Sequence, residues 1–102
     1  MKLLLITAVA AYTKEVKHIL KIAQVKAYSY KEVIGCSNDV SENAIESNWF
    51  GTERNENESV LFYAFVPTEN VATVFDAVKE FNATQETLSH IHVAVIKIEK
   101  SN

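Results

Sequence analysis

Two histidines near the end of the chain, His90 and His92, have the spacing of a metal-binding pair. On a β-strand every second side chain points to the same face, so both imidazoles would lie on one face. A zinc-type site needs further ligands, which Cys36 or an acidic residue could supply from the same or a neighbouring subunit. Two imidazoles on an edge strand are more often solvated or hydrogen-bonded, and both interpretations stay open.

Cys36 is the only cysteine of the chain. A reactive cysteine needs a base or a positive neighbour to lower its pKa, and the local sequence offers none, which favours an inert, half-buried thiol. A lone cysteine excludes an intrachain disulfide and favours a reducing compartment, so we expect a cytoplasmic protein. The sequence contains no G-x-S-x-G or H-E-x-x-H motif, and its two glycines cannot form a phosphate-binding loop. We therefore expect no enzyme.

A long polar segment, residues 36–58, carries most of the negative charge. It holds six acidic residues and Arg54 as its only basic residue, a net charge of −5 that leaves +2 for the rest of a chain whose total is −3. Such a long loop inside a small domain is usually functional or disordered. Trp49 and Phe50 are candidate anchors for a partner protein, because aromatic residues dominate interface hot spots. The alternative is that they pack on their own subunit.

Positive charges gather on the outer face of the first predicted helix, at Lys14, Lys17, His18 and Lys21. This face could bind an anion, but a solvated helix surface explains it as well. Neither it nor the net charge provides the concentrated basic surface that nucleic-acid binding requires. No apolar run approaches the roughly 20 residues of a membrane helix, so we expect no membrane-spanning segment.

The hydrophobic pattern alternates between the period of strands and that of helices. It predicts strands at 3–9, 27–35, 59–66 and 90–98, with helices that begin at the N-cap candidates Thr13 and Thr68. The N-terminal apolar run also resembles a signal peptide, but it is short for one, and its length favours a buried strand. The order β-α-β-β-α-β predicts an α+β, ferredoxin-like single domain over residues 1–102, with a four-stranded antiparallel sheet and both helices on one face.

The two predicted central strands are apolar on both faces. The segment 59–66 alternates Val60 and Phe62 with Leu61 and Tyr63, and the segment 3–9 is apolar almost throughout. Two helices can cover only one face of such a sheet. The other face would exceed the apolar patch typical of a monomer, so we expect a second copy of the chain to cover it.

Short motifs in this sequence resemble those of the PII signalling proteins. The stretch 32–35, Glu-Val-Ile-Gly, is similar to the E-V-x-G that precedes the T-loop of that family. The stretch 66–71, from Val66-Pro67 onward, resembles the start of the family's second helix. The long segment 36–58 lies where the T-loop lies, and the resemblance extends over residues 2–99.

The resemblance implies a homotrimer whose sheets face one another around a threefold axis. It implies ligand clefts between subunits near the loop base, which here is Gly35, Cys36, Ser37 and Asn38. It also implies that the T-loop-like segment docks on a membrane transporter or an enzyme, through Trp49, Phe50 and Arg54 in this chain.

The chain departs from the family in its nucleotide-binding loops. Residues 82–89 contain no glycine and no lysine where most PII proteins have T-G-x-x-G-D-G-K, and the family's R-T-G-E is absent after the last strand. We therefore expect a divergent PII-like regulatory protein that does not bind ATP, ADP or 2-oxoglutarate in the family's usual way. Its ligand stays unknown.

Two rival functions remain at this stage. The first is a metal-binding trimer, similar to CutA-type proteins or to PII-like proteins associated with metal efflux, with a divalent metal on His90, His92 and Cys36. The second is an enzyme built on a dimeric ferredoxin-like barrel, which no visible acid–base pair or nucleophile supports.

Overall fold

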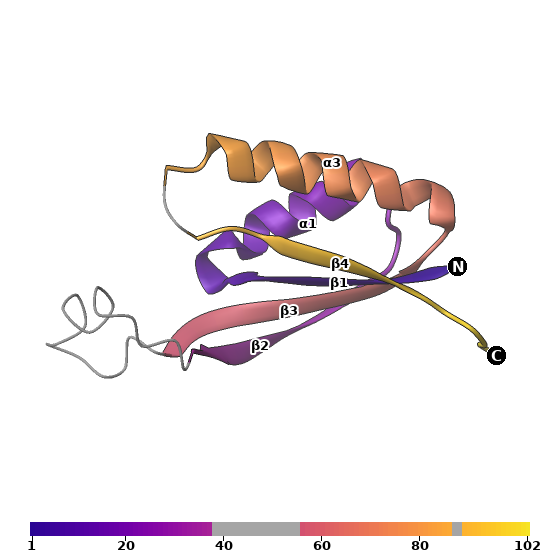
Figure 1. The fold of residues 1–102 in the computed structure, drawn as a ribbon, viewed down its shortest axis with the longest axis horizontal. Helices are drawn as coiled ribbons and strands as arrows, with labels where there is room; N and C mark the ends of the chain where they lie inside the picture. Colours follow the sequence, from indigo (N-terminus) through magenta and orange to yellow (C-terminus); the bar gives the residue numbers. More distant parts are fainter. Residues whose placement is uncertain (38–55, 87–88) are drawn as a thin grey trace, which may run out of the picture.

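The computed structural model describes residues 1–37, 56–86 and 89–102. Four strands form one antiparallel sheet in the order β2-β3-β1-β4, and two helices lie across one of its faces (Figure 1). The α+β, ferredoxin-like fold expected from the sequence is thereby confirmed. The elements are β1 (Lys2–Val9), η1 (Ala10–Tyr12), α1 (Thr13–Ile22), β2 (Ser29–Cys36), β3 (Glu56–Val66), α3 (Thr68–Thr84) and β4 (His92–Lys97).

The covered face of the sheet, which lies under the helices, forms the core. Leu4, Ile6 and Ala8 of β1 are buried on it and pair with Ala64, Phe62 and Val60 of β3. Because side chains alternate along a strand, this register places every second residue of both central strands under the helices. The N-terminal apolar run thus forms β1, one of the two central strands of the sheet, as its short length predicted.

Each helix contributes a stripe of apolar side chains to this core. Val16, Ile19 and Leu20 of α1 are buried, as are Val74 and Val78 of α3. Their spacing of three and four residues puts them on one side of a helix, which is why the predicted stripes were sufficient to locate both helices.

The predicted N-caps of the helices were wrong. Thr13 is the first residue of α1, and its hydroxyl donates to the carbonyl oxygen of Ala10 at 2.6 Å, across the 3-10 turn that leads into the helix. Pro67 occupies the N-cap position of α3, with no side-chain cap hydrogen bond. In both places the N-cap position belongs to the residue before the threonine, Tyr12 or Pro67.

The strand boundaries also differ from the predicted ones around the loop. β2 continues to Cys36 and β3 begins at Glu56, and these two residues are Cα partners. Residues 36 and 56–58, which the sequence pattern assigned to the loop, therefore belong to the paired strands. At the other turn, α3 continues to Thr84 and β4 begins at His92.

The outer face of the sheet, opposite the helices, carries apolar side chains from all four strands. They are Val33 of β2, Leu61, Tyr63 and Phe65 of β3, Leu3, Leu5 and Val9 of β1, and Ala94 and Ile96 of β4. Phe65 is 56% exposed and Ile96 is 45% exposed. No element among the described residues packs on this face.

Asn82 joins the end of α3 to the residue that leads into β4. Its side-chain amide donates to the carbonyl oxygen of Ile91 at 2.9 Å and accepts from the Ile91 N–H at 2.8 Å. Next to it, Tyr12 packs edge-on against Phe81, with ring centroids 5.0 Å apart, and the Tyr12 hydroxyl donates to the carbonyl oxygen of Ser89 at 3.3 Å. These contacts place the buried Ile91 in the core. No helix within the described residues has the length and apolarity that crossing a membrane requires.

We expect Asn82→Ala to destabilise the protein by about 1–3 kcal/mol, because the partly buried backbone groups of Ile91 lose both hydrogen bonds. Urea unfolding measures the effect. Asn57→Ala, at an exposed position of β3, is the matched control and should change stability by less than about 0.5 kcal/mol. Equal losses in both variants would contradict the role assigned to Asn82.

Candidate functional site

A depression of about 390 Å3 lies on the sheet beside the loop base and is lined by Thr7, Ala8, Val9, Val33, Gly35, Ser59 and His90. We call it the loop-base depression. Apart from Ala8, the strand residues that line it belong to the outer face, because Thr7 pairs with Leu61, and Val33 pairs with Ser59. Three strand ends and the segment before β4 therefore meet where the chain leaves for residues 38–55.

The polar groups of the depression are two hydroxyls and one imidazole. Thr7 and His90 are exposed, and Ser59 is half-buried beside the apolar Val9 and Val33. The Ser59 hydroxyl donates weakly to the carbonyl oxygen of Asn57 at 3.4 Å. Hydroxyl and imidazole groups can both donate and accept hydrogen bonds, so this arrangement suits a small polar ligand with an apolar side.

Gly35 determines how much room the depression has. A Cβ atom at this position would lie 2.9 Å from the Ser59 Oγ atom, which is closer than an ordinary contact. A larger residue here would therefore require the Ser59 hydroxyl to move. This explains in physical terms why the last strand residues before the loop include a glycine.

A second depression, of about 350 Å3, lies beside the same strand ends and is lined by Ala10, Glu32, Val33, Ile34, Glu58 and Ser59. The side chains of Glu32, Ile34 and Glu58 point to the covered face, since Ile34 and Glu58 are Cα partners. Its two carboxylates contrast with the hydroxyls and imidazole of the loop-base depression. The loop base thus presents chemically different surfaces on the two faces of the sheet.

The structure describes three of the four predicted loop-base residues. Gly35 lines the loop-base depression, Cys36 is the exposed last residue of β2, and Ser37 follows it, also exposed. Asn38 lies outside the described residues, as do the predicted partner-binding residues Trp49, Phe50 and Arg54. Thr7, Ser59 and His90 complete the depression. Sequence analysis did not assign Thr7 or Ser59 to it, although Thr7 is a polar residue within an apolar strand.

The predicted metal ligands do not come together within one chain. The residues 90 and 92 lie toward the outer face, where His92 is the Cα partner of Thr7. Cys36 shares the parity of Ile34 and so points to the covered face, where its thiol contacts the carbonyl oxygen of Ile34 at 3.9 Å. No group of three potential ligands forms anywhere in the described ranges. The metal-binding interpretation therefore finds no support in the fold.

We expect Gly35→Ala to leave stability nearly unchanged, because the gain from replacing a strand glycine, about 0.5–1 kcal/mol, is offset by crowding against Ser59. In a Ser59→Ala background the crowding atom is absent, and the same substitution should stabilise by about 0.5–1 kcal/mol. Unfolding free energies of the four proteins measure this coupling. Equal effects of Gly35→Ala in both backgrounds would show that the close approach does not exist in solution.

Comparisons with known proteins agree on the fold. No protein-family model and no curated protein matches the sequence. Among solved structures, CPII from Thiomonas intermedia K12, bound to ADP, AMP and acetate, superposes with a TM-score of 0.61 at 19% identity, over 97% of this chain and 88% of that chain. A further CPII structure, described as a nitrogen regulatory PII-like protein bound to ADP, AMP and bicarbonate, gives 0.59 at 20% identity, over 99% and 94%.

A DUF3240 family protein from Shewanella baltica OS155 superposes with a TM-score of 0.66 at 13% identity, over 99% of this chain and 92% of that chain. Nearly the whole chain therefore takes part in each superposition, as the sequence resemblance predicted. The chain has a divergent PII-like fold.

Proposed function

We propose that this protein is a non-enzymatic, PII-like regulatory protein that works as a homotrimer, binds a small ligand at the loop base, and contacts a transporter or an enzyme through residues 36–58. The observation that carries the proposal is the open apolar outer face, which borders the loop-base depression. A face that needs a second subunit and a cavity at its margin together favour a ligand site between subunits.

The outer face is suited to self-association. Its central residues, Leu5 of β1 and Tyr63 of β3, are Cα partners, and Phe65 and Ile96 extend the apolar surface toward the other end of the sheet. Burying such a surface stabilises an assembly by about 25 cal/mol for each Å2 removed from water. The threefold symmetry is an expectation that comes from the family resemblance.

The loop-base depression would be completed by a neighbouring subunit in such a trimer. Its open side is the outer face, where a second copy would pack against Val9 and Val33. The solved CPII structures contain ADP and AMP with acetate or bicarbonate, which makes these molecules the first ligands to test. The absence of glycine and lysine from residues 82–89 still argues against the family's usual mode of nucleotide binding.

We expect native mass spectrometry to find a trimer and Tyr63→Lys to convert it to monomers, because the substitution places a charge in the centre of the outer face. Ile22→Lys is the matched control, since Ile22 is 53% exposed on α1, on the helix side of the sheet. This variant should remain trimeric. A monomeric wild-type protein, or a trimer that survives Tyr63→Lys unchanged, would refute the proposed assembly.

We expect a ligand at the loop base to change the rate at which trypsin cleaves after Arg54, because residues 38–55 leave the sheet beside the depression. Mass spectrometry follows the cleavage with ADP, AMP, acetate and bicarbonate added singly and in pairs. Gly35→Val, which fills the depression, should abolish the change, whereas Ala72→Val on the exposed side of α3 should not. A rate unaffected by every addition would contradict ligand sensing by this route.

A further inference from the structure

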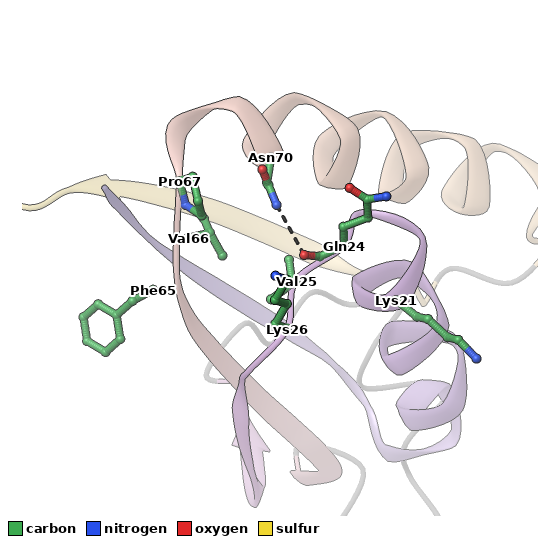
Figure 2. Close-up of a pocket in the computed structure, with 8 residues that line it drawn as sticks. All are labelled: Lys21, Gln24, Val25, Lys26, Phe65, Val66, Pro67 and Asn70. Carbon is green, nitrogen blue, oxygen red and sulfur yellow. Dashed lines mark hydrogen bonds between the residues drawn. The ribbon is translucent and has the colours of Figure 1, made fainter.

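A larger cavity, of about 710 Å3, lies at the opposite end of the sheet from residues 38–55 and is lined by Lys21, Gln24, Val25, Lys26, Phe65, Val66, Pro67 and Asn70 (Figures 1 and 2). We call it the distal cavity. Figure 2 shows one wall formed by the end of α1 and the segment after it, and another formed by the corner between β3 and α3. The distal cavity shares no residue with the loop-base depression.

The distal cavity exists because β2 does not pair with the last residues of β3. The ladder between β2 and β3 begins at the pair Ser29 and Tyr63, so residues 26–28 run beside the last part of β3 without pairing to it. At the end of α1, Gln24 adopts a left-handed conformation with φ of 59°, and the Val25 N–H donates to the carbonyl oxygen of Leu20 at 2.9 Å. This helix ending turns the chain out of α1 and into the segment that leads to β2.

Hydrogen bonds from one side chain connect the two walls of the distal cavity. The Asn70 side-chain amide donates to the carbonyl oxygens of Ala23 at 3.2 Å and Gln24 at 3.4 Å, and the second of these bonds is drawn in Figure 2. The first turn of α3 is thereby fixed to the end of α1. A non-glycine residue held at a positive φ costs about 1 kcal/mol or more, and such strain is often retained where it shapes a functional surface.

The charged residues that line the distal cavity are basic. Its lining contains two lysines, Lys21 and Lys26, and no acidic residue. Val66 in its wall is the Cα partner of Lys2, and Lys2 is in turn the Cα partner of Lys97 in β4. Two lysines thus lie directly opposite each other on neighbouring strands, an arrangement that repulsion makes unfavourable.

In the described parts of the chain, the ammonium groups of Lys2, Lys21, Lys26 and Lys97 form no hydrogen bond and no ion pair. Lys17, by contrast, donates a side-chain hydrogen bond to Tyr30. The excess acidic charge of the sequence lies in residues 36–58, which connect the end of β2 to the start of β3. Among the described residues, therefore, no acidic side chain, including Glu69 beside the cavity wall, forms an ion pair with these lysines.

We propose that the distal cavity binds a phosphate-bearing anion. Lys21 and Lys26 supply the charge and the hydrogen-bond donors, and Lys2 and Lys97 raise the local potential from the adjoining strands. Figure 2 shows the Lys21 side chain pointing away from the other lining residues, and its flexible four-carbon stem allows the ammonium group to turn to a ligand. Val25 and Pro67 provide apolar contact for the rest of the ligand.

The test is a titration of the full-length protein with inorganic phosphate and pyrophosphate, followed by the backbone amide NMR signals of Gln24, Val25 and Asn70. Lys21→Gln with Lys26→Gln should weaken binding about tenfold or more, because both charge-assisted contacts are lost. Lys14→Gln with Lys79→Gln is the control, since it removes the same charge from exposed positions outside the distal cavity. It should weaken binding less than about twofold.

The source of the phosphate is distinguished by vesicles of equal parts phosphatidylcholine and phosphatidylglycerol. Lysine-dependent cosedimentation with these vesicles, stronger than the response to free phosphate, would assign the distal cavity to a lipid headgroup. Binding of phosphate or pyrophosphate without cosedimentation would assign it to a free anion. No binding of any of the three probes, or equal weakening in both double variants, would overturn the proposal.

A second measurement does not need the lysines of the cavity wall to be changed. Lys97→Gln should raise the thermal unfolding midpoint at low salt more than Lys79→Gln does, since it removes the repulsion with Lys2. Pyrophosphate should raise the midpoint of the wild-type protein more than that of Lys97→Gln. Identical responses of wild type and Lys97→Gln would contradict the unbalanced charge on which the proposal rests.

Discussion

A sheet with two apolar faces and helices on only one of them is the constraint on which the rest of this structure depends. The covered face buries Leu4, Ile6 and Phe62 almost completely, so the helices already satisfy one side of the central strands. The outer face retains exposed aromatic residues such as Tyr63 and Phe65. Because the core and the outer face alternate along the same strands, each central strand contributes apolar side chains to both faces.

The two ends of the sheet differ in chemistry. At the loop end, the outer face ends in hydroxyls and an imidazole, contributed by Thr7, Ser59 and His90. At the other end, Lys21 and Lys26 line a larger cavity, and Lys2 and Lys97 lie on the adjoining strands. The two cavities therefore present different chemical groups to a ligand.

Element types were predictable from the sequence because they depend on local periodicity, whereas sites depend on register. The stripe through Val16 and Leu20 located α1, but the 3-10 turn before Thr13 has no such signal. The parity of β2 placed Cys36 on the face opposite residues 90 and 92, which a list of candidate ligands cannot reveal. The distal cavity required knowing where β2 stops pairing with β3, and the opposition of Lys2 and Lys97 required the exact ladder.

The length of β3 has a consequence for how this chain can change over evolution. The strand carries Ser59 at the loop-base depression and Phe65 at the distal cavity, with the core residues Val60, Phe62 and Ala64 between them. Inserting or deleting one residue between these points would exchange core and outer side chains over the remaining strand. A change in chain length is therefore better tolerated in the connections between elements than within β3.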